Sequence, residues 1–374
     1  MSSTCLTIDL DQLAKNWQTF QQAYEQKGLA KTIGAVVKAD AYGLGAERVV
    51  RRLWDEGCRI FFVAHACEGA VVSEVIDPGV ADIYVFHGCR PGQEELFATH
   101  RLIPVLNSFD DVERWARFAQ QSKYGRAGLH VDTGMNRLGF SKTGFQEVCS
   151  APDLLDCMDV CLIMSHLVQA DEPLKAINLQ QKHAFEDVMA LRPPSLANVP
   201  LSMANSAGVL NGADYHYDVA RVGIGLYGGN PFSDQPNPCQ PVVTLESEIL
   251  QINELDVGQS VSYGACWQAE RPSRIATLAI GYADGLLRHS GQFGHVALHG
   301  QLAPIVGRVT MDLTMVDVTD IEGGEVKAGD RAEIVGKTIT VDDLARAADT
   351  IGYEVLTNFG RQSNNSRVKR TYIG

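Results

Sequence analysis

A lysine followed by a glycine-rich turn is the first feature of the chain that could do chemistry. Lys38 comes at the end of the apolar, partly β-branched segment 32–37, and Gly43 and Gly45 follow it. Such a segment is typical of a buried parallel strand, and the glycines predict a turn that leads into a helix. We therefore expect Lys38 at the carboxyl end of a strand, where parallel α/β proteins place their active sites. There a lysine can act as a nucleophile or a base, whereas its alternative role is that of a solvated loop residue.

Further polar residues follow other apolar segments in the same way. They are Arg137 after the fifth segment, His166 after the sixth, Asn205 and Ser206 after the seventh, and Arg221 and Gly223 in the eighth. Each one has a structural alternative, since His166 could be a core histidine, Ser206 a helix cap and Arg221 half of an ion pair. Their common placement at the ends of strands favours one shared site.

The elements that must position these residues form a repeating pattern. Eight short apolar segments alternate with segments of helical length, among them 110–121 and 177–191. The apolar segments are 32–37, 60–64, 83–86, 102–106, 128–132, 160–165, 201–204 and 219–222. Eight such units predict an α/β fold, a (β/α)8 TIM barrel over residues 10–230. A doubly wound sheet is the alternative, but it would usually have fewer strands.

The seventh and eighth units of such a barrel usually bind phosphate. Ser206 and the backbone of Gly223 and Ile224 belong to these units. Tyr42 adds a phenol beside the predicted helix start, where free backbone N–H groups favour anions. A phosphate corner together with Lys38 indicates pyridoxal phosphate bound covalently to that lysine.

A second domain is expected after a cluster of turn residues near 229–241. The segments 242–252, 274–280, 295–298, 315–318 and 331–335 predict strands, and 342–348 predicts a helix. The sequence therefore predicts a mostly-β C-terminal domain over residues 240–374, which the N-terminal strand, within 1–9, is expected to join.

Composition narrows the class of protein. The chain has 32 Lys and Arg against 45 Asp and Glu, a net charge of -13, which argues against nucleic-acid and anionic-membrane partners and suits a small-molecule enzyme. Neither a secretory signal nor a membrane-spanning run is found, so we expect a cytoplasmic protein. The nine cysteines have no spacing typical of disulfides or zinc, and we expect buried thiols and no metal site.

Seven motifs, taken in order, resemble those of the alanine racemase family. They are VKADAYG at 37–43, DTGMNRLG at 132–139, ANS at 204–206, RVGIGLYG at 221–228, YG at 263–264, GYADG at 281–285 and GRVTMD at 307–312. The resemblance implies a homodimer with shared active sites that interconverts L-alanine and D-alanine. Lys38 would hold the cofactor and act as one base, and Tyr263 of the partner subunit would be the other. His166 would be the hydrogen-bond partner of Tyr263.

The resemblance also assigns the remaining site residues. The cofactor would be bound by Tyr42, His166, Asn205, Ser206, Arg221, Gly223, Ile224 and Tyr353, with Arg221 facing the pyridine nitrogen. Arg137 and the backbone N–H of Met311 would bind the substrate carboxylate. Two positions depart from the family. His130 stands where many relatives have a carbamylated lysine, so we expect an anion such as chloride near Arg137, and Ser202 stands where relatives often have a histidine.

Three other functions compete with this one. The first is a racemase for serine or for a broader set of amino acids. The second is a non-catalytic pyridoxal-phosphate-binding protein, a class that lacks the β-domain and thus Tyr263 and Met311. The third is a decarboxylase of the same two-domain plan, which would need an acid where Arg221 stands.

Overall fold

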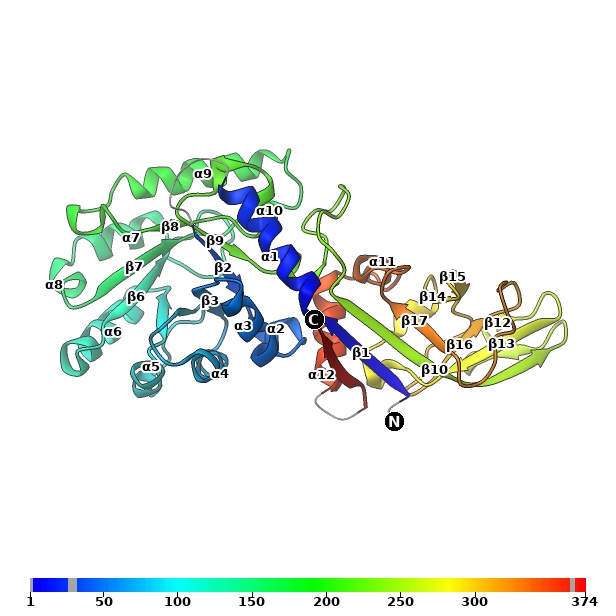
Figure 1. Cartoon of the computed structure of the whole chain (residues 1–374). Coiled ribbons are helices and arrows are strands. Elements are labelled where there is room, and N and C mark those ends of the chain that lie inside the picture. The colour runs from blue at the N-terminus through cyan, green and yellow to red at the C-terminus, as the bar shows by residue number, and fades with distance from the viewer. Residues whose placement is uncertain (1–2, 26–31, 364–366) are drawn as a thin grey trace.

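The computed structural model describes residues 3–25, 32–363 and 367–374. Two domains lie end to end (Figure 1), a barrel surrounded by helices and a domain dominated by strands. Residues 1 and 2 of the predicted N-terminal strand lie outside the described residues, as do 364–366 of the C-terminal domain.

The barrel contains the eight predicted parallel strands. They are β2 (Thr32–Val36), β3 (Ile60–Val63), β4 (Asp82–Val85), β5 (Ile103–Leu106), β6 (Arg126–His130), β7 (Asp159–Met164), β8 (Leu201–Ser202) and β9 (Val219–Val222). Their order is β8-β7-β6-β5-β4-β3-β2-β9. Backbone hydrogen bonds of 2.9 Å from Asp218 N to Leu201 O and from Arg221 N to Ala204 O connect the two end strands. The barrel prediction is confirmed, and the doubly wound sheet is excluded.

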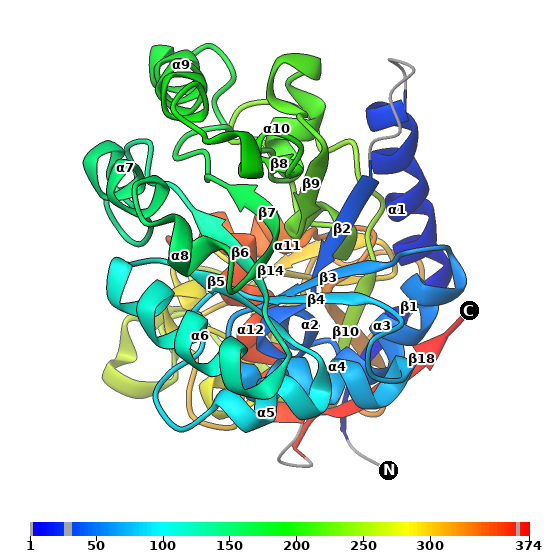
Figure 2. The ribbon, with the colours of Figure 1, turned by 90° about the vertical axis from the view of Figure 1, so that its left-hand side faces the viewer.

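Helices cover the outside of the strands (Figure 2). They are α1 (Leu10–Glu25), α3 (Ala46–Asp55), α4 (Ala66–Ile76), α5 (Glu94–His100), α6 (Phe109–Ser122), α7 (Lys142–Cys149), α8 (Pro152–Leu155) and α9 (Ala176–Met189), with short α2 (Lys38–Tyr42), α10 (Ser206–Leu210) and 3-10 turn η3 (Ile224–Tyr227) at the ends of strands. Helix α6 shows how the sequence sets them. Ser108 accepts a hydrogen bond from Asp111 N and caps the helix, and Val112, Trp115 and Ala119 bury one face at helical spacing.

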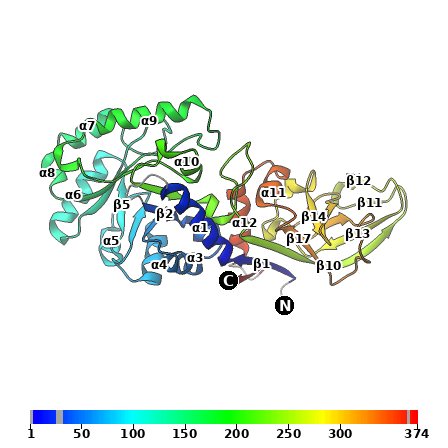
Figure 3. The ribbon, with the colours of Figure 1, turned by 45° about the horizontal axis from the view of Figure 1, so that its top comes forward.

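The second domain is built on one sheet that contains the first and the last described strand. Its strands are β1 (Thr4–Asp9), β10 (Val243–Leu255), β13 (Ser273–Leu278), β14 (His295–Leu298), β15 (Gln301–Pro304), β16 (Thr314–Asp317), β17 (Arg331–Val335) and β18 (Lys369–Ile373). Strand β1 pairs antiparallel with β10 and parallel with β18. A separate hairpin of β11 (Ser260–Val261) and β12 (Trp267–Gln268) lies at the end of the domain far from the barrel (Figure 3).

The described part of this domain has two α-helices, α11 (Val341–Ala347) and α12 (Gly352–Ser363). Helix α12 was not predicted, because its buried apolar residues are few: Val355, Leu356 and Phe359. The helix packs instead through a glycine, and Gly360 lies so close to Gly43 that a Cβ at 360 would be 2.1 Å from the Gly43 Cα.

The cysteines are all free thiols, but not all are buried. Cys58, Cys89 and Cys239 are buried, whereas Cys67 and Cys266 are exposed, so the expectation of buried thiols is wrong for these two. Within the described parts of the chain, no helix is long and apolar enough to cross a membrane.

Candidate active site

Lys38 lies at the carboxyl end of β2, at the start of a left-handed turn that the sequence did not predict. The next four residues, Ala39 to Tyr42, have φ between 54° and 56°, and Gly43 follows with φ 85°. For residues with a Cβ, this conformation costs roughly 1–2 kcal/mol each. Hydrogen bonds of 2.9 Å from Ala41 N to Val37 O and 2.7 Å from Gly43 N to Ala39 O close the turn. Contacts from elsewhere must stabilise such a segment.

The second domain supplies several of those contacts. Arg370 on β18 donates to Asp40 Oδ2 through both terminal nitrogens at 3.1 Å, and to the Gly43 carbonyl at 2.9 Å. The other carboxylate oxygen of Asp40 accepts from Ala46 N at 2.7 Å and ties the turn to α3. The C-terminal strand therefore stabilises the backbone that carries Lys38.

The surroundings of Lys38 make its amine easier to deprotonate. Burial lowers the pKa of Lys38, and the positive charge of Arg137 lowers it further, while the Glu68 carboxylate acts in the opposite direction. A neutral amine is the form that attacks a carbonyl compound or accepts a proton.

The predicted phosphate residues meet at one corner of the barrel mouth. The ring of Tyr42 stacks on Tyr227 with centroids 4.5 Å apart and lies 5.8 Å from the ring of Tyr353 on α12. Gly223 follows β9, and a Cβ there would lie 2.5 Å from the Tyr42 hydroxyl. Ser206 Oγ accepts from Gly223 N at 3.0 Å. Only glycine at 223 leaves space beside the phenol.

Asn205 has a different local role from its neighbour Ser206. Its side-chain oxygen accepts from Gly208 N at 2.9 Å and caps α10. Asn205 and His166 also line a cleft of about 650 Å³ between the barrel and the second domain, together with Asp171, Asn230, Arg346 and Tyr353.

Arg221 is buried behind this corner with one unused donor. Its terminal nitrogens donate to Ser202 Oγ and, at 2.6 Å, to the Ser165 carbonyl. Its Nε–H has no hydrogen-bond partner among the described residues. Burial lowers the pKa of Arg221 to about 9, so the guanidinium remains charged at neutral pH. Ser202 therefore accepts one of the hydrogen bonds that this buried arginine must make.

The protonation state of His166 follows from Arg221. Arg221 Nη2 lies 3.0 Å from His166 Nδ1, and a guanidinium can only donate, so Nδ1 accepts. Burial and the charge of Arg221 hold the pKa of His166 well below its usual value. His166 is thus neutral, with its proton on Nε2.

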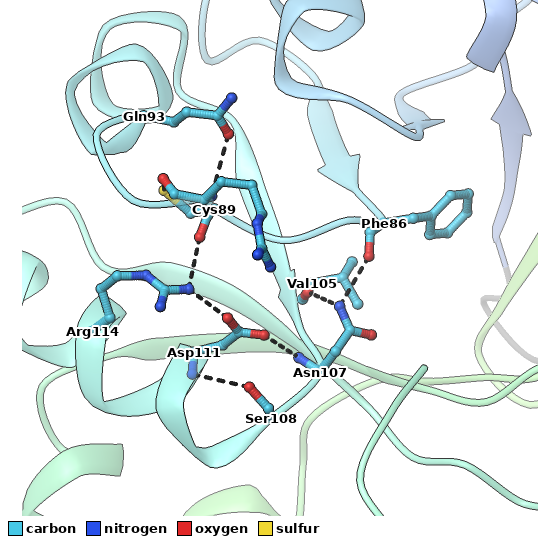
Figure 4. A network of polar contacts seen from close by, with 9 residues as sticks. Phe86, Cys89, Gln93, Val105, Asn107, Ser108, Asp111 and Arg114 are labelled. Carbon is cyan, nitrogen blue, oxygen red and sulfur yellow. Dashed lines mark hydrogen bonds and ion pairs between the residues drawn. The ribbon is translucent and has the colours of Figure 1, made fainter. Parts of the chain in front are cut away.

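His130 is neutral for a related reason. The side-chain nitrogen of Asn107 donates to the carbonyls of Phe86 and Val105 (Figure 4), so its oxygen is the atom 2.8 Å from His130 Nδ1 and accepts from it. Burial and the charge of Arg221 lower the pKa of His130 to about 4. His130 therefore supplies no negative charge to Arg137. The side chain of Arg137 is exposed and makes no hydrogen bond or ion pair within the described residues.

The structure of a single chain does not bring Tyr263 and Met311 to this mouth. Tyr263 lies on the turn between β11 and β12, in the hairpin far from the barrel (Figure 3), and is 73% exposed. Met311 is 53% exposed, and its carbonyl accepts from Ala283 N at 3.0 Å. Gly281 is required there, because a Cβ would lie 2.4 Å from the Met311 oxygen.

Comparison with known proteins decides the family. Models of the N-terminal and C-terminal domains of alanine racemase match residues 8–231 and 242–372. The chain belongs to the alanine racemase family. The family predicted from the seven motifs is thereby confirmed, and with it a racemase that depends on pyridoxal phosphate.

Individual members of the family are similar over their whole length. The alanine racemase of Rhizobium meliloti (strain 1021) is 42% identical, and the match covers 100% of this chain and 97% of that protein. A crystal structure of the alanine racemase of Bartonella henselae, with covalently bound pyridoxal phosphate, is similar with a TM-score of 0.91, 34% identity and full coverage of both chains. The biosynthetic alanine racemase of Pseudomonas aeruginosa gives a TM-score of 0.89 at 32% identity, again with full coverage of both.

The residues of this alanine racemase chain fit the family cofactor. The unpaired Nε–H of Arg221 is a buried donor that needs an acceptor, as a pyridine nitrogen would be. A Cβ at Gly223 would clash with the Tyr42 hydroxyl, so the glycine lets this phenol lie next to the backbone that donates to Ser206 Oγ, and the two hydroxyls are polar groups that can bind a phosphate. Lys38 lies at the same mouth, at the carboxyl end of β2. The two-domain structure also disfavours a single-barrel binding protein, and the guanidinium of Arg221 disfavours a decarboxylase.

Proposed function

We propose that the protein interconverts L-alanine and D-alanine with pyridoxal phosphate, using Lys38 and Tyr263 of the partner subunit as two bases. The observation that carries this proposal is the convergence of Lys38, Ser206 and the unpaired Arg221 Nε–H at one barrel mouth. When bound, the cofactor supplies electron withdrawal that makes the α-proton of an amino acid acidic.

Lys38 serves one face of the amino acid. Its lowered pKa keeps a larger share of the amine neutral near pH 7, in the form that accepts the α-proton. Inversion requires a second group on the opposite face to return a proton. Tyr263 fits that role only if it comes from another copy of the chain, since its own hairpin lies far from β2, the strand that Lys38 follows (Figure 3). The active unit is therefore a homodimer in which each site takes residues from both subunits.

His166 would stabilise the charged form of Tyr263, the form that acts as a base. Because Arg221 holds His166 in the neutral form with its proton on Nε2, His166 can donate a hydrogen bond to a phenolate oxygen. A hydrogen bond to the charged form favours that form. Lys38 and Tyr263 can then exchange the roles of acid and base in the two directions.

Arg221 limits side reactions. A guanidinium has no acceptor and does not give up its proton at neutral pH, so Arg221 leaves the ring nitrogen of the cofactor unprotonated. The ring is then a weaker electron sink than one paired with an acid. We infer that this favours return of the proton to the α-carbon over transamination.

The substrate carboxylate would be bound by Arg137 and the backbone N–H of Met311 from the partner subunit. Since His130 is neutral, a small anion such as chloride is proposed beside Arg137. A crystal soaked in bromide should show an anomalous peak near Arg137, and a featureless map there would contradict the anion.

The experiment that tests the function is turnover of each enantiomer by purified protein. L-alanine and D-alanine should both be racemised, and faster than L-serine, L-lysine or L-arginine. Comparable rates with the larger substrates would favour the broad-specificity racemase. Lys38→Ala should abolish the visible absorbance of the covalently held cofactor.

Tyr263→Phe separates the two bases. It should impair abstraction of the proton from L-alanine selectively, measured as solvent isotope exchange from each enantiomer. Equal losses in both directions would refute the assignment of Tyr263. Sedimentation of the wild-type protein as a monomer at assay concentration, with full activity, would refute the shared site.

A further inference from the structure

Glu68 joins the ends of two barrel strands through one carboxylate. Its Oε1 accepts from Ala39 N at 2.7 Å, and its Oε2 accepts from Ala64 N at 2.9 Å and His65 N at 3.0 Å. Ala64 and His65 follow β3, and Ala39 is the first residue of the left-handed turn after β2. The carboxylate thus links the peptide next to Lys38 to the neighbouring strand.

The contact with Ala39 is distinct from the helix cap. Glu68 is the third residue of α4, and its bonds to the β3–α4 turn are those of a capping box with His65 as N-cap. A cap needs only the backbone at the start of its own helix. The bond to Ala39 N reaches another strand, and it fixes the first peptide of a segment whose conformation is intrinsically unfavourable.

We propose that Glu68 is a positioning residue that holds the backbone of Lys38 so that its amine meets the cofactor aldehyde. This rests on the proposed function, in which Lys38 binds pyridoxal phosphate. The turn begins at Lys38 and ends at Tyr42, and Glu68 contacts only its first peptide. Loss of Glu68 should therefore disturb capture by the lysine and leave the phosphate corner at Tyr42 intact.

Arg370 and Asp40 hold the other part of the turn, so Glu68 is one of two supports. Arg370 donates to Asp40 and Gly43, in the part of the turn toward Tyr42. The N–H of Ala39, at the start of the turn, donates to Glu68 instead. Because the supports act at different peptides, their variants should differ in which part of cofactor binding they weaken.

Two ligands separate these parts in a binding experiment. Pyridoxal phosphate can bond covalently to Lys38, whereas pyridoxine 5′-phosphate carries an alcohol in place of the aldehyde and cannot. The full-length protein is freed of cofactor, and the dissociation constants of both ligands are measured by absorbance or fluorescence titration. Lys38→Ala gives the ratio of the two dissociation constants that is expected when the lysine forms no covalent bond to the cofactor.

Glu68→Asp is the main variant because it keeps the charge and the cap. Asp343 shows in this chain that an aspartate at the third helical position can cap, since it accepts from Thr340 N at 2.8 Å at the start of α11. A side chain shorter by one methylene loses its reach to Ala39 N. Asp343→Asn is the control for a weakened cap at the third position of a helix, in the second domain.

Glu68→Asp should bind pyridoxal phosphate about tenfold more weakly, the effect of one lost hydrogen bond to a charged group. Its affinity for pyridoxine 5′-phosphate should stay within about twofold of wild type, as should both affinities of Asp343→Asn. Unchanged pyridoxal phosphate binding, or equal weakening of both ligands, would overturn the proposal.

Glu68→Gln covers the case in which the aspartate variant does not fold. Its single amide oxygen cannot accept from Ala39 N and from the β3–α4 turn together, so a selective loss of pyridoxal phosphate affinity is expected, smaller than that of Glu68→Asp because removal of the charge makes the Lys38 amine easier to deprotonate. If neither variant folds, Glu68 is a structural cap and the proposal fails. If the wild-type protein itself fails to bind pyridoxal phosphate covalently, the proposed function fails instead.

Discussion

Replacing Arg370 by alanine tests whether the second domain stabilises the left-handed turn. The side chain is 14% exposed and donates to Asp40 Oδ2, Gly43 O and Gly360 O at 2.9 to 3.1 Å. The variant leaves three acceptors without this donor. Hydrogen bonds to charged groups contribute about 1.5–3 kcal/mol each, but those of one side chain are not additive and the Asp40 carboxylate is partly hydrated. We therefore expect a loss of about 2–4 kcal/mol.

For a domain of this size, 1 kcal/mol corresponds to a change in melting temperature of about 2–4 °C. Arg370→Ala should thus lower the melting temperature by about 4–16 °C, measured by circular dichroism at 222 nm. Arg370→Lys should recover only part of the loss, since one ammonium group lacks the planar fork that reaches the carboxylate and two carbonyls together. The affinity for pyridoxal phosphate should fall as well, because the turn leads to Tyr42.

Arg271→Ala is the control, because Arg271 also pairs with a carboxylate, Asp320, but both side chains are more than half exposed. Such surface pairs contribute about 0–1 kcal/mol. The reasoning is wrong if Arg370→Ala melts within the range of Arg271→Ala. A double-mutant cycle with Asp40→Asn isolates the ion pair, and a coupling energy near zero would mean that the carbonyl contacts alone matter.

Two further predictions follow from the barrel mouth. Gly223→Ala should weaken pyridoxal phosphate binding by at least about tenfold, since a Cβ would lie 2.5 Å from the Tyr42 hydroxyl. The control is Gly144→Ala, whose Cβ has no neighbour closer than 3.4 Å and which should bind the cofactor normally. Equal affinities of the two variants would contradict the clash. His130 has a folded pKa of about 4 against a usual value of 6.5, so the unfolded chain binds the proton first as pH falls, and stability present above pH 6.5 is lost toward pH 4. This amounts to about 3 kcal/mol, and urea unfolding of His130→Gln should show a correspondingly shallower pH dependence than wild type, whereas parallel curves would refute the burial of a neutral His130.

Much of the candidate site could be proposed from the sequence because its residues follow the ends of parallel strands. The segments before Lys38, His166 and Ser206 are apolar and of strand length, and parallel strands of one barrel bring their carboxyl ends together. Order along the chain therefore implied proximity in space. The motifs added the family, since several short patterns in a fixed order are far more specific than any single residue.

The conformations around these residues depended on contacts that are distant in sequence. Nothing in the segment Ala39 to Tyr42 indicates a left-handed turn, since alanine and tyrosine usually avoid it; Arg370, more than 300 positions later, helps to stabilise it there. Helix α12 likewise has few apolar residues, and its place is set by the contact between Gly360 and Gly43.

The sequence by itself determined the barrel, the second domain and the residue types at the mouth, because hydrophobic periodicity and turn residues act locally. Only the tertiary structure decided the protonation states. Arg221 makes His166 an acceptor at Nδ1, and Asn107 makes His130 a donor at Nδ1, through contacts between different strands. Burial and neighbouring charge set these states, and both exist only after the chain has folded.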